Sequence, residues 1–264
     1  MATIHPMSIV DPRAEIADSV YIGPFCTVGP NVKIGEGTWL QSHVVVDGVT
    51  EIGRNNKIYA GAAVGIEPQD KKYAGEPTRL IIGDNNVIRE NCTLSTGTIQ
   101  DESVTIVGNN NLFMANVHIA HDCRIGSGTI MANNVGLAGH AHVGDDAVIG
   151  GQAGVHQFVR IGKGVMIAGG SMIRQDVMPY TMVAGHPASS MGLNLEGMKR
   201  HQYTREAMRA VREVYKIIFR GGYTVVESIE KINEFIQQLE DESAKQCCCL
   251  MRDFLQESKR GVTR

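Results

Sequence analysis

Residues 117–159 read VHIAHDCRIGSGTIMANNVGLAGHAHVGDDAVIGGQAGVHQFV. A hydrophobic residue recurs at every sixth position of this stretch, namely Ile119, Ile125, Met131, Leu137, Val143, Ile149 and Val155. A period of six fits neither the 3.6-residue repeat of a helix nor the strict alternation of a strand. It is typical of a parallel β-helix, in which each hexapeptide forms a short strand and a turn, and three hexapeptides close one coil of about 18 residues.

The same period covers most of the chain from Ile4 to Ile173. One register begins at Ile4 and continues to Val64, a second covers Ile82 to Leu94, and a third extends from Val107 to Ile173. Every position in these registers is hydrophobic, which chance composition does not produce. We therefore predict a mainly β fold built from stacked hexapeptide coils.

The position four residues after each periodic hydrophobic residue is small or β-branched. Cys26, Cys92 and Cys123 occupy this position, so we predict that they fill the core and are not nucleophiles. The turns between strands need residues that tolerate a positive φ. The asparagine runs at 55–56, 85–86, 109–111 and 133–134 meet this need.

Two segments interrupt the repeat. Residues 65–79, GIEPQDKKYAGEPTR, are polar and contain prolines and glycines, so we predict a loop that projects from the coil. Asp70, Lys71 and Lys72 in this loop are candidates for a binding feature, because insertions in repeat arrays often form one. The second interruption, residues 99–105, is shorter and shifts the phase of the repeat by one residue.

The pattern becomes helical near Leu195. Apolar spacing predicts a helix over residues 204–219, a second from the Thr224/Glu227 capping box to about Leu239, and a third over 242–258. The run Cys247–Cys249 lies in the third helix and favours packing over metal binding. We predict two domains, a β-helix domain over residues 1–190, with its loop insertion at 65–79, and an α-helical domain over 191–264.

Composition excludes several classes of protein. The formal net charge is −3 and no long basic run occurs, which argues against nucleic-acid binding. The first residues lack the basic and apolar regions of a signal peptide, and no apolar run approaches the roughly 18 to 20 residues that span a membrane. We expect a cytoplasmic protein with reduced cysteines and no stable membrane insertion.

The histidines are the best indication of function. Positions one full coil apart should stack on one corner of the rod, so His121 should lie beside Gly139, and Gly139 beside Gln157. His118, His140 and His156 should join this band, with His118 near the preceding bend, whereas the place of His142 is less clear. Histidine suits proton transfer near neutral pH, the adjacent Asp122 could orient His121, and Gly139 leaves an unobstructed backbone N–H for an oxyanion.

Several motifs make the pattern specific: NVHIAHDC (116–123), LAGHAHV (137–143), VHQFVRIG (155–162), QDKKYAGEPTR (69–79) and NLEGMKR (194–200). With them the chain resembles, over nearly its whole length, the UDP-N-acetylglucosamine O-acyltransferases, which catalyse the first step of lipid A synthesis. The resemblance implies a left-handed parallel β-helix followed by a small C-terminal α-helical domain. It also implies a homotrimer whose grooves lie between subunits, and transfer of an (R)-3-hydroxyacyl chain from acyl carrier protein to the 3-hydroxyl of UDP-N-acetylglucosamine, without a metal or other cofactor.

The resemblance also assigns roles to individual residues. The catalytic residues are His121 as general base, Asp122 as its partner, and Gly139 as the amide donor to the thioester oxygen. The substrate-binding residues are Asp70, Lys72, His118, His140, His156, Gln157, Asn194, Glu196 and Arg200, the last three in a nucleotide-binding segment. Gly169, Gly170 and Met172, a few coils beyond the base, are candidates to set the acyl-chain length by closing the acyl groove.

The chain departs from the family pattern in two places. Ser95 and Thr96 stand where many members have His-Arg, and position 201 is His where a second arginine is common. Three alternatives stay open at this stage: a related N-acyltransferase acting on an amino-sugar acceptor, a γ-type carbonic anhydrase with zinc between subunits, and a non-catalytic scaffold for a carrier protein. The first normally has an extra N-terminal domain, whereas the repeat here starts at Ile4.

Overall fold

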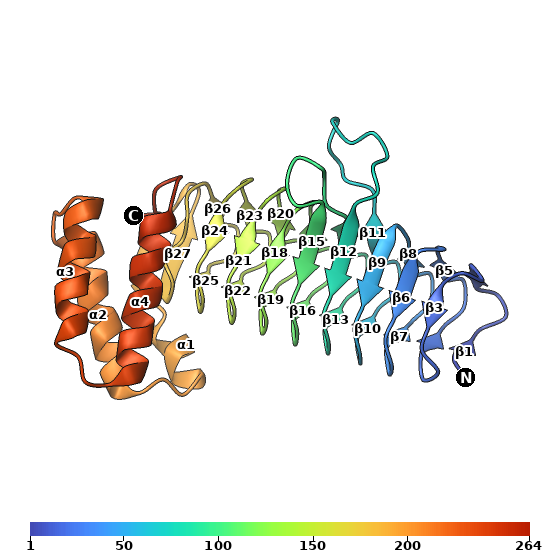
Figure 1. Cartoon of the computed structure of the whole chain (residues 1–264), viewed down its shortest axis with the longest axis horizontal. Coiled ribbons are helices and arrows are strands. Elements are labelled where there is room, and N and C mark those ends of the chain that lie inside the picture. Colours follow the sequence, from blue (N-terminus) through green and yellow to red (C-terminus); the bar gives the residue numbers. More distant parts are fainter.

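Short parallel strands form the three faces of a rod, and four helices pack at one end of it (Figure 1). The structure, a computed structural model, describes residues 1–264. The first sheet contains β1 (Thr3–Ile4), β4 (Tyr21–Ile22), β7 (Trp39–Leu40), β10 (Lys57–Ile58), β13 (Val87–Ile88), β16 (Leu112–Phe113), β19 (Ile130–Met131), β22 (Val148–Ile149), β25 (Met166–Ile167), β27 (Thr181–Gly185) and β28 (Ala188–Leu193).

The other two faces have the same construction. The second sheet contains β2 (Ile9–Val10), β5 (Thr27–Val28), β8 (Val45–Val46), β11 (Ala63–Ile66), β14 (Thr93–Ser95), β17 (His118–Ile119), β20 (Gly136–Leu137), β23 (Gly154–Val155) and β26 (Met172–Ile173). The third contains β3 (Glu15–Ile16), β6 (Val32–Ile34), β9 (Val49–Ile52), β12 (Arg79–Ile82), β15 (Val104–Val107), β18 (Arg124–Ile125), β21 (His142–Val143) and β24 (Arg160–Ile161).

The pairing register relates residue number directly to position on the rod. Outside the two insertions and before the last coil, each strand pairs with the strand three hexapeptides further along the chain, so that Ile119 lies beside Leu137 and Leu137 beside Val155. Only β27 and β28 pair in antiparallel fashion. A residue's position within its coil therefore fixes its face, its corner and whether it points inward.

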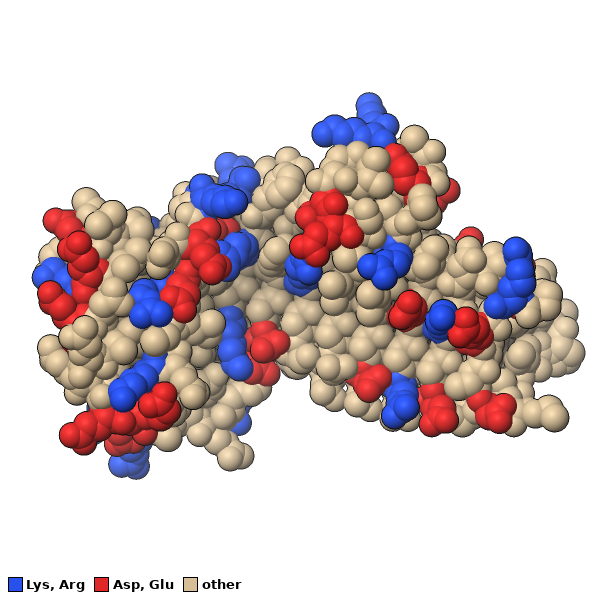
Figure 2. Space-filling view, in the orientation of Figure 1, with Lys and Arg blue, Asp and Glu red and all other residues tan.

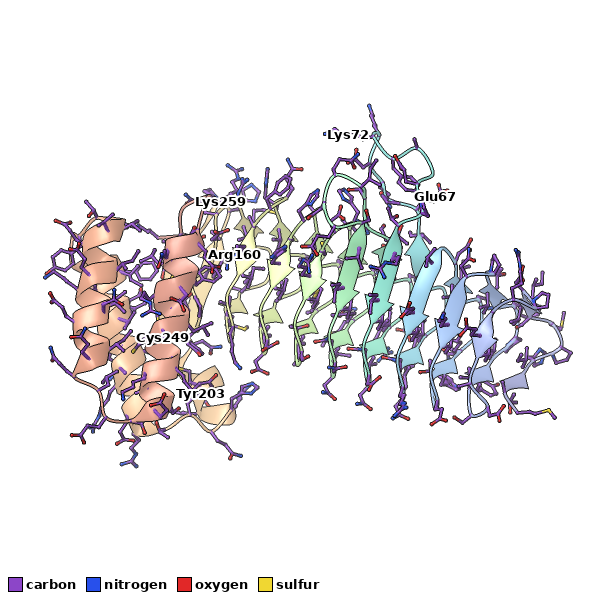
Figure 3. All side chains as sticks on the ribbon, in the orientation of Figure 1. Glu67, Lys72, Arg160, Tyr203, Cys249 and Lys259 are labelled. Atoms are coloured by element: carbon purple, nitrogen blue, oxygen red, sulfur yellow. The ribbon has the colours of Figure 1, made fainter.

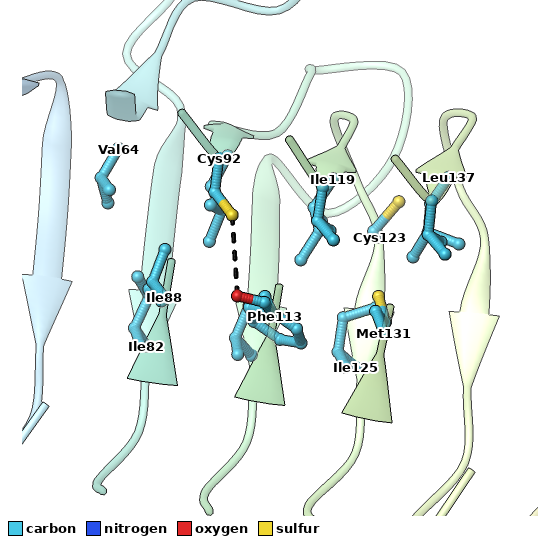
Figure 4. Close-up of a cluster of buried hydrophobic side chains, with 14 of the residues drawn as sticks. Val64, Ile82, Ile88, Cys92, Phe113, Ile119, Cys123, Ile125, Met131 and Leu137 are labelled. Carbon is cyan, nitrogen blue, oxygen red and sulfur yellow. Dashed lines mark hydrogen bonds between the residues drawn. The ribbon is translucent and has the colours of Figure 1, made fainter. Parts of the chain in front are cut away.

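The periodic hydrophobic residues form the core of the rod. Those from Ile22 onward are buried, whereas Ile4 is 42% exposed and Val10 and Ile16 are half-buried because the first coil has no neighbour beneath it. Figure 4 shows this packing around Phe113, Met131 and the aliphatic residues of the neighbouring coils. Burying one such side chain contributes roughly 1.5–3 kcal/mol, so the stack supplies the main driving force for folding.

The three isolated cysteines point into this core, as predicted. Cys92 Sγ lies 3.8 Å from the carbonyl oxygen of Phe113 (Figure 4). Burial raises the pKa of Cys92 to about 11 and that of Cys123 to about 12, so both remain neutral thiols at physiological pH. A protonated and enclosed thiol is not a nucleophile, which agrees with the prediction of a packing role.

The asparagine runs combine two roles. The prediction that they serve turns is confirmed for the asparagines with a positive φ, which are Asn55, Asn85, Asn110 and Asn134, and is wrong for the buried Asn56, Asn86 and Asn111. Asn85 has a φ of 58°, as a turn requires, but Asn86 is fully buried. The Asn86 side chain donates to Asn56 Oδ1 at 3.0 Å and accepts from the Asn111 backbone N–H at 3.0 Å. An amide can donate and accept at once, so Asn56, Asn86 and Asn111, one in each of three successive coils, form a ladder inside the rod.

Two loops leave the coil near the middle of the rod and project from the same edge of it (Figure 1). The first lies between β11 and β12 and covers residues 67–78. The second lies between β14 and β15 and covers residues 96–103. Strand structure therefore resumes at Val104, whereas the sequence had indicated that the interruption continues to residue 105. Ladder hydrogen bonds to β12 restore the strand before the hydrophobic period itself resumes.

The helical end begins with α1 (Leu195–Arg200), followed by α2 (Arg205–Arg220), α3 (Val225–Gln237) and α4 (Glu242–Glu257). The predicted Thr224/Glu227 capping box is present at the start of α3. Cys247 and Cys248 are buried between the helices, whereas Cys249 is half-buried. None of the helices combines the length and the apolar character that crossing a membrane requires.

Candidate active site

The corner between the second and third sheets carries the predicted histidine column. Because the ladder aligns residues one coil apart, His121, Gly139 and Gln157 occupy equivalent positions of three successive coils. The next residue at this corner, Asp122 in the first of these coils and His140 in the second, has a φ of 59° in both cases. This left-handed conformation turns the chain sharply and brings each of these side chains toward its neighbour in the column.

His121 and Asp122 form the central pair of the site. The distance from His121 Nδ1 to Asp122 Oδ2 is 2.8 Å. A carboxylate can only accept, so Nδ1 of the neutral ring carries the proton and Nε2 keeps its lone pair. Asp70 Oδ2 of the long loop lies 3.9 Å from Nε2. The geometry leaves Nε2 available to take a proton from a substrate hydroxyl.

Asp122 is held by the shorter loop. Its side chain is 1% exposed, and Thr98 donates to both carboxylate oxygens, through its N–H at 2.8 Å and its hydroxyl at 2.6 Å. The Asp122 backbone N–H donates to Thr105 Oγ1 at 2.8 Å. Burial alone would raise the pKa of Asp122, but the hydrogen bonds from His121 and Thr98 outweigh it and lower the pKa below its ordinary value. The carboxylate therefore stays ionised beside the imidazole.

The position of the His121 ring requires a glycine at residue 139. A methyl group on Gly139 would lie 2.5 Å from His121 Cε1 and 2.6 Å from Nε2, so only glycine lets the ring occupy this place. The Gly139 N–H has no acceptor within the chain, and neither does the amide of His121 or of Gln157. Gly139 differs from the other two residues because it lies directly against the His121 ring, beside Nε2.

Two further histidines flank the pair. His140 packs edge-on against the His121 ring, stacks on Phe158 with ring centroids 4.4 Å apart, and has Nδ1 2.9 Å from Asp101 Oδ2. His118 lies on β17, on the outer face of the second sheet, two residues after the turn at Asn116, whose φ is 63°. Its Nδ1 is 2.7 Å from Thr93 Oγ1.

A cavity of about 780 Å³ opens above these groups, and the long loop supplies one of its walls. It is lined by Gln69, Asp70, Lys71, Lys72, Gln100, Asp101, His121, His140, Gln157 and Phe158. Figure 3 shows Lys72 at the tip of this loop. Of the predicted histidines at this corner, neither His118 nor His156 lines this cavity. His156 is exposed beside Gln157, with Nδ1 3.0 Å from the carbonyl oxygen of Gln157.

The two residues predicted to set acyl length lie toward the helical end. Met172 on β26 follows His118 along the outer face of the second sheet, and its Sδ covers Gly154, 2.8 Å from where a β-carbon there would stand. Gly169 lies in the turn between β25 and β26, at the corner of the first and second sheets. A β-carbon on Gly169 would meet only the Gly151 backbone, with the carbonyl oxygen at 3.2 Å.

The predicted nucleotide-binding residues lie on a different face. Asn194, Glu196 and Arg200 line a hollow of about 390 Å³ between α1 and the outer face of the first sheet. Asn194 also caps α1, accepting from the Gly197 N–H at 3.0 Å. The first sheet is the face opposite the His121 corner, so a single chain does not bring these residues to the catalytic pair.

The two departures from the family pattern are both accounted for structurally. Ser95 is buried and its hydroxyl has no partner, while Thr96 accepts a hydrogen bond from the Thr78 hydroxyl at 3.0 Å, so neither reaches the cavity. His201 lines the hollow beside Arg200, and its Nδ1 lies 3.7 Å from Asp146 Oδ1.

Sequence reasoning missed Thr98, Asp101 and Phe158. Thr98 and Asp101 belong to the second interruption, where no period relates sequence to position. Their only signal was that the interruption immediately precedes the histidine-rich stretch. Phe158 was detectable, since it stands three hexapeptides after His140 and therefore next to it in the column.

The cluster of His121, Asp122 and His140 also meets the geometric condition for a metal site, because one ligand atom from each lies within 4.8 Å of the others. The donor set fits poorly. Both carboxylate oxygens of Asp122 already accept from Thr98, and Oδ2 accepts from His121 as well. Binding a cation there would have to displace these hydrogen bonds.

Comparison with known proteins identifies the family of this chain. Residues 176–263 match the family described as Udp N-acetylglucosamine O-acyltransferase, domain 2, and residues 105–139 and 140–175 match the bacterial transferase hexapeptide repeat. The chain is 58% identical to the acyl-[acyl-carrier-protein]–UDP-N-acetylglucosamine O-acyltransferase of Psychrobacter sp. (strain PRwf-1), over 100% of both chains.

Solved structures give the same result. The UDP-N-acetylglucosamine O-acyltransferase of Moraxella catarrhalis superposes with a TM-score of 0.94 at 48% identity, over 99% of both chains. The UDP-N-acetylglucosamine acyltransferase of Francisella novicida gives 0.95 at 43% identity, over 99% of this chain and 94% of that one. The predicted left-handed parallel β-helix with a C-terminal helical part is thereby confirmed.

Hexapeptide coils that carry a histidine–aspartate pair at one corner define the protein as a hexapeptide-repeat acyltransferase. Within that class the whole-length identity is decisive. The chain belongs to the family of UDP-N-acetylglucosamine O-acyltransferases.

Proposed function

We propose that this enzyme transfers an (R)-3-hydroxyacyl chain from acyl carrier protein to the 3-hydroxyl of UDP-N-acetylglucosamine, the first step of lipid A biosynthesis. The observation that carries the proposal is the His121–Asp122 pair, with Nδ1 2.8 Å from Oδ2 and Nε2 unoccupied beside Gly139. The name of the 58% identical relative, which includes both the carrier protein and the nucleotide sugar, supports the choice of substrates. We place the enzyme in the cytoplasm, in keeping with cysteines that are all free thiols.

The chemistry requires one base and one oxyanion donor. His121 Nε2 removes the proton of the 3-hydroxyl while the hydroxyl oxygen attacks the thioester carbon. The carbonyl oxygen gains negative charge, which the Gly139 N–H stabilises. The carbon–sulfur bond then breaks and the thiolate takes the proton back from His121, so no covalent enzyme intermediate, metal or other cofactor is needed. Asp122 stabilises the imidazolium that exists between the two proton transfers.

The remaining residues bind the substrates. Asp70, Lys72, His118, His140, His156 and Gln157 hold the sugar and the acyl group near His121. Asn194, Glu196 and Arg200 bind the nucleotide, with Arg200 pairing with phosphate. Because these three lie on the opposite face of the chain, the proposal requires a homotrimer in which the first sheet of one copy faces the His121 corner of the next.

Acyl-chain length is set beyond the base. Met172 and Gly169 lie toward the helical end from His121, so a chain that starts at the thioester and runs along the rod reaches them at its far end. We propose that the absence of a side chain at Gly169 admits a longer chain, and that Met172 bounds it.

The test is an assay of the purified protein with UDP-N-acetylglucosamine and acyl carrier proteins loaded with a ladder of 3-hydroxyacyl and unsubstituted chains. An O-acyl product is expected with a 3-hydroxyacyl donor. His121→Asn should lower kcat by about 10²- to 10⁴-fold, the usual contribution of general acid–base catalysis. The matched control is His43→Asn, because His43 is exposed and stacks only on Phe25.

Other outcomes would identify the alternatives. An alkali-stable amide product, formed only from an amino-sugar acceptor, would indicate N-acyl transfer. Stoichiometric zinc together with activity lost on chelation would assign a metalloenzyme to the cluster of His121, Asp122 and His140. An intact trimer that binds the carrier protein but transfers nothing would indicate a scaffold.

A further inference from the structure

A second histidine–aspartate pair lies beside the catalytic one. His140 Nδ1 is 2.9 Å from Asp101 Oδ2, which resembles the contact of 2.8 Å between His121 Nδ1 and Asp122 Oδ2 one coil earlier. Both imidazoles line the same cavity. The site therefore contains two rings that are each held at Nδ1 by a carboxylate, and the chemistry described above assigns a role to only one of these carboxylates.

Asp101 belongs to the shorter loop, residues 96–103, and this loop is bonded to both coils. Thr98 donates to Asp122 in the first coil, and Asp101 contacts His140 in the next. The loop also closes on itself, since the Asp101 N–H donates to the Thr98 carbonyl oxygen at 3.2 Å. Figure 2 shows acidic side chains gathered at this loop, over β15 and β18. Because one loop contacts both pairs, its fold places the two rings relative to each other.

The two oxygens of the Asp101 carboxylate have different partners. Oδ1 accepts from the Glu102 backbone N–H at 3.0 Å, and Oδ2 faces His140 Nδ1. The bond to Glu102 lies within the loop and fixes which oxygen faces the ring. The Asp101 side chain is 35% exposed, whereas that of Asp122 is 1% exposed. Solvent screens Asp101 more strongly, so its main contribution to the site is the orientation of His140 and not its charge.

The His140 ring is restrained on its other sides as well. One face stacks on Phe158 with an angle of 11° between the rings, and its edge meets the His121 ring with centroids 5.1 Å apart. Nε2 lies 3.8 Å from Asp122 Oδ2, which is too far for a hydrogen bond. That oxygen already accepts from His121 and from Thr98. With Nδ1 donating to Asp101, the neutral ring keeps its lone pair on Nε2 and has a free acceptor there.

We propose that Asp101 is a positioning residue for this reaction: it holds His140 with the proton on Nδ1, so that Nε2 accepts a hydrogen bond from a hydroxyl or amide N–H of the acceptor sugar. The inference rests on the proposed function, because it takes the sugar to occupy the cavity. A site built to hydrogen-bond such a group loses affinity when its own partner is inverted from acceptor to donor. Asp101 acts through His140, and a ring that is already fixed loses little freedom on binding.

The neighbouring Glu102 provides a matched comparison. Its carboxylate pairs with Arg124 on β18 at 2.6 Å and so also ties the shorter loop to the rod, but the Glu102 side chain is 69% exposed. An exposed ion pair of this kind contributes little to stability. Glu102→Gln therefore removes the same charge from the same loop and leaves the contact with His140 in place.

Nitrogen NMR of protein labelled in its histidines measures the tautomer directly, and the His140 signals are identified by their loss in His140→Gln. In wild type we expect the proton on Nδ1. In Asp101→Asn the carboxamide oxygen should stay on the Glu102 N–H, so its N–H₂ group faces the ring and the proton moves to Nε2. Glu102→Gln should keep the wild-type signals. A His140 tautomer that is the same in wild type and Asp101→Asn would overturn the inference.

Steady-state kinetics test the consequence for binding. Asp101→Asn should raise the KM for UDP-N-acetylglucosamine on the order of tenfold, as expected for the loss of one hydrogen bond, while kcat and the KM for the acyl donor stay within about threefold of wild type. Asp101→Glu keeps a carboxylate and should recover part of the loss. In the His140→Ala background, Asp101→Asn should change nothing further, because it acts through that ring.

The remaining outcomes separate the explanations. Additive losses in the double variant, or an equal rise of KM in Glu102→Gln, would overturn the inference and assign the effect to the fold of the loop. All variants should keep the wild-type unfolding temperature. The tautomer is measured without substrate, so it does not depend on the proposed function. The expected tautomers without any turnover of UDP-N-acetylglucosamine by wild type would overturn the proposed function and leave the role of Asp101 in orienting His140 standing.

Discussion

At the scale of single residues, the site depends on the absence of a side chain at Gly139 as much as on the side chains around it. His121 can stand beside its coil neighbour only because Gly139 has no β-carbon. The backbone of Gly139 does not adopt a positive φ, so the constraint is one of space and not of conformation. A residue whose role is to leave room is invisible to a search for reactive groups, although the period places it next to the base.

Substitution of Gly139 by alanine tests this constraint. The methyl group would overlap the His121 ring, so the imidazole must rotate away from Asp122, and we expect kcat to fall on the order of 100-fold with little change in unfolding temperature. Steady-state kinetics of Gly139→Ala, His121→Ala and the double variant provide the measurement. Because the methyl group acts through His121, it should add nothing in the His121→Ala background, and additive losses would contradict the argument.

His118 predicts a pH effect on stability. Burial lowers its pKa below the ordinary value of 6.5, and the proximity of His121 lowers it further. Below about pH 6.5, His118 of the unfolded chain therefore becomes protonated while His118 of the folded chain stays neutral. The free energy of unfolding falls as the pH decreases, until the pH reaches the pKa of His118 in the folded chain. The contribution of His118 is fully present above the pKa of the unfolded chain.

Thermal unfolding of wild type and His118→Asn between mildly alkaline and mildly acidic pH measures this effect. The variant should lose less stability on acidification than wild type does. Thr93→Val removes the hydrogen bond to His118 but keeps the histidine, so it should retain the wild-type slope. A variant slope as steep as that of wild type would mean that His118 does not contribute to the acid sensitivity.

At the scale of elements, each coil must satisfy polar groups inside a narrow core. The inward asparagines do this in series, and their side chains link coils that hydrophobic residues join only by packing. In the helical domain, a side chain at the start of each helix accepts a hydrogen bond from a backbone N–H of the first turn. Both devices satisfy backbone donors that repetition alone would leave without partners.

Replacement of Asn86 by leucine tests the ladder. The change preserves volume but leaves the Asn111 N–H and the Gly108 carbonyl oxygen without their partner, which costs about 3 kcal/mol. Asn85→Gly is the matched control, because its φ of 58° suits glycine and the change should stay within about 1 kcal/mol. Chemical denaturation of both variants gives the comparison, and equal losses would show that the inward asparagine has no special role.

At the scale of the whole molecule, one chain holds two partial sites on opposite faces. His121 lies at the corner of the second and third sheets, and Arg200 lies against the first. If the working site combines these residues from neighbouring copies, inactive variants of different kinds should complement each other.

Mixing unfolded His121→Ala and Arg200→Ala chains in equal amounts and refolding them together tests this arrangement. Random assembly leaves about one site in four with both wild-type residues, so about a quarter of wild-type activity should return. A His121→Ala/Arg200→Ala double variant refolded with His121→Ala supplies the control, since no site in that mixture has an intact His121. Failure of the two single variants to complement would place the whole site within one chain.

Many residue positions in this fold can be predicted from the sequence because the six-residue period of the repeat is constant. A constant shift of three hexapeptides per coil converts a difference in residue number directly into a place on the rod. The stacking of His121, Gly139 and Gln157 and the inward position of Cys92 could therefore be read from residue numbers alone. The capping box of α3 was equally readable, since capping is a local effect of neighbouring residues.

The positions of residues outside the repeat were decided only by the tertiary structure. Thr98 and Asp101 lie in a loop with no repeat, and their bonds to Asp122 and His140 depend on how that loop folds back over the corner. Arg260 stands beside Arg174 because the chain returns from α4, and its Nε donates to the Arg174 carbonyl oxygen at 3.4 Å, a contact between residues far apart in sequence. A repeat determines position by counting, whereas loops and returning segments find their places through long-range packing that no local pattern encodes.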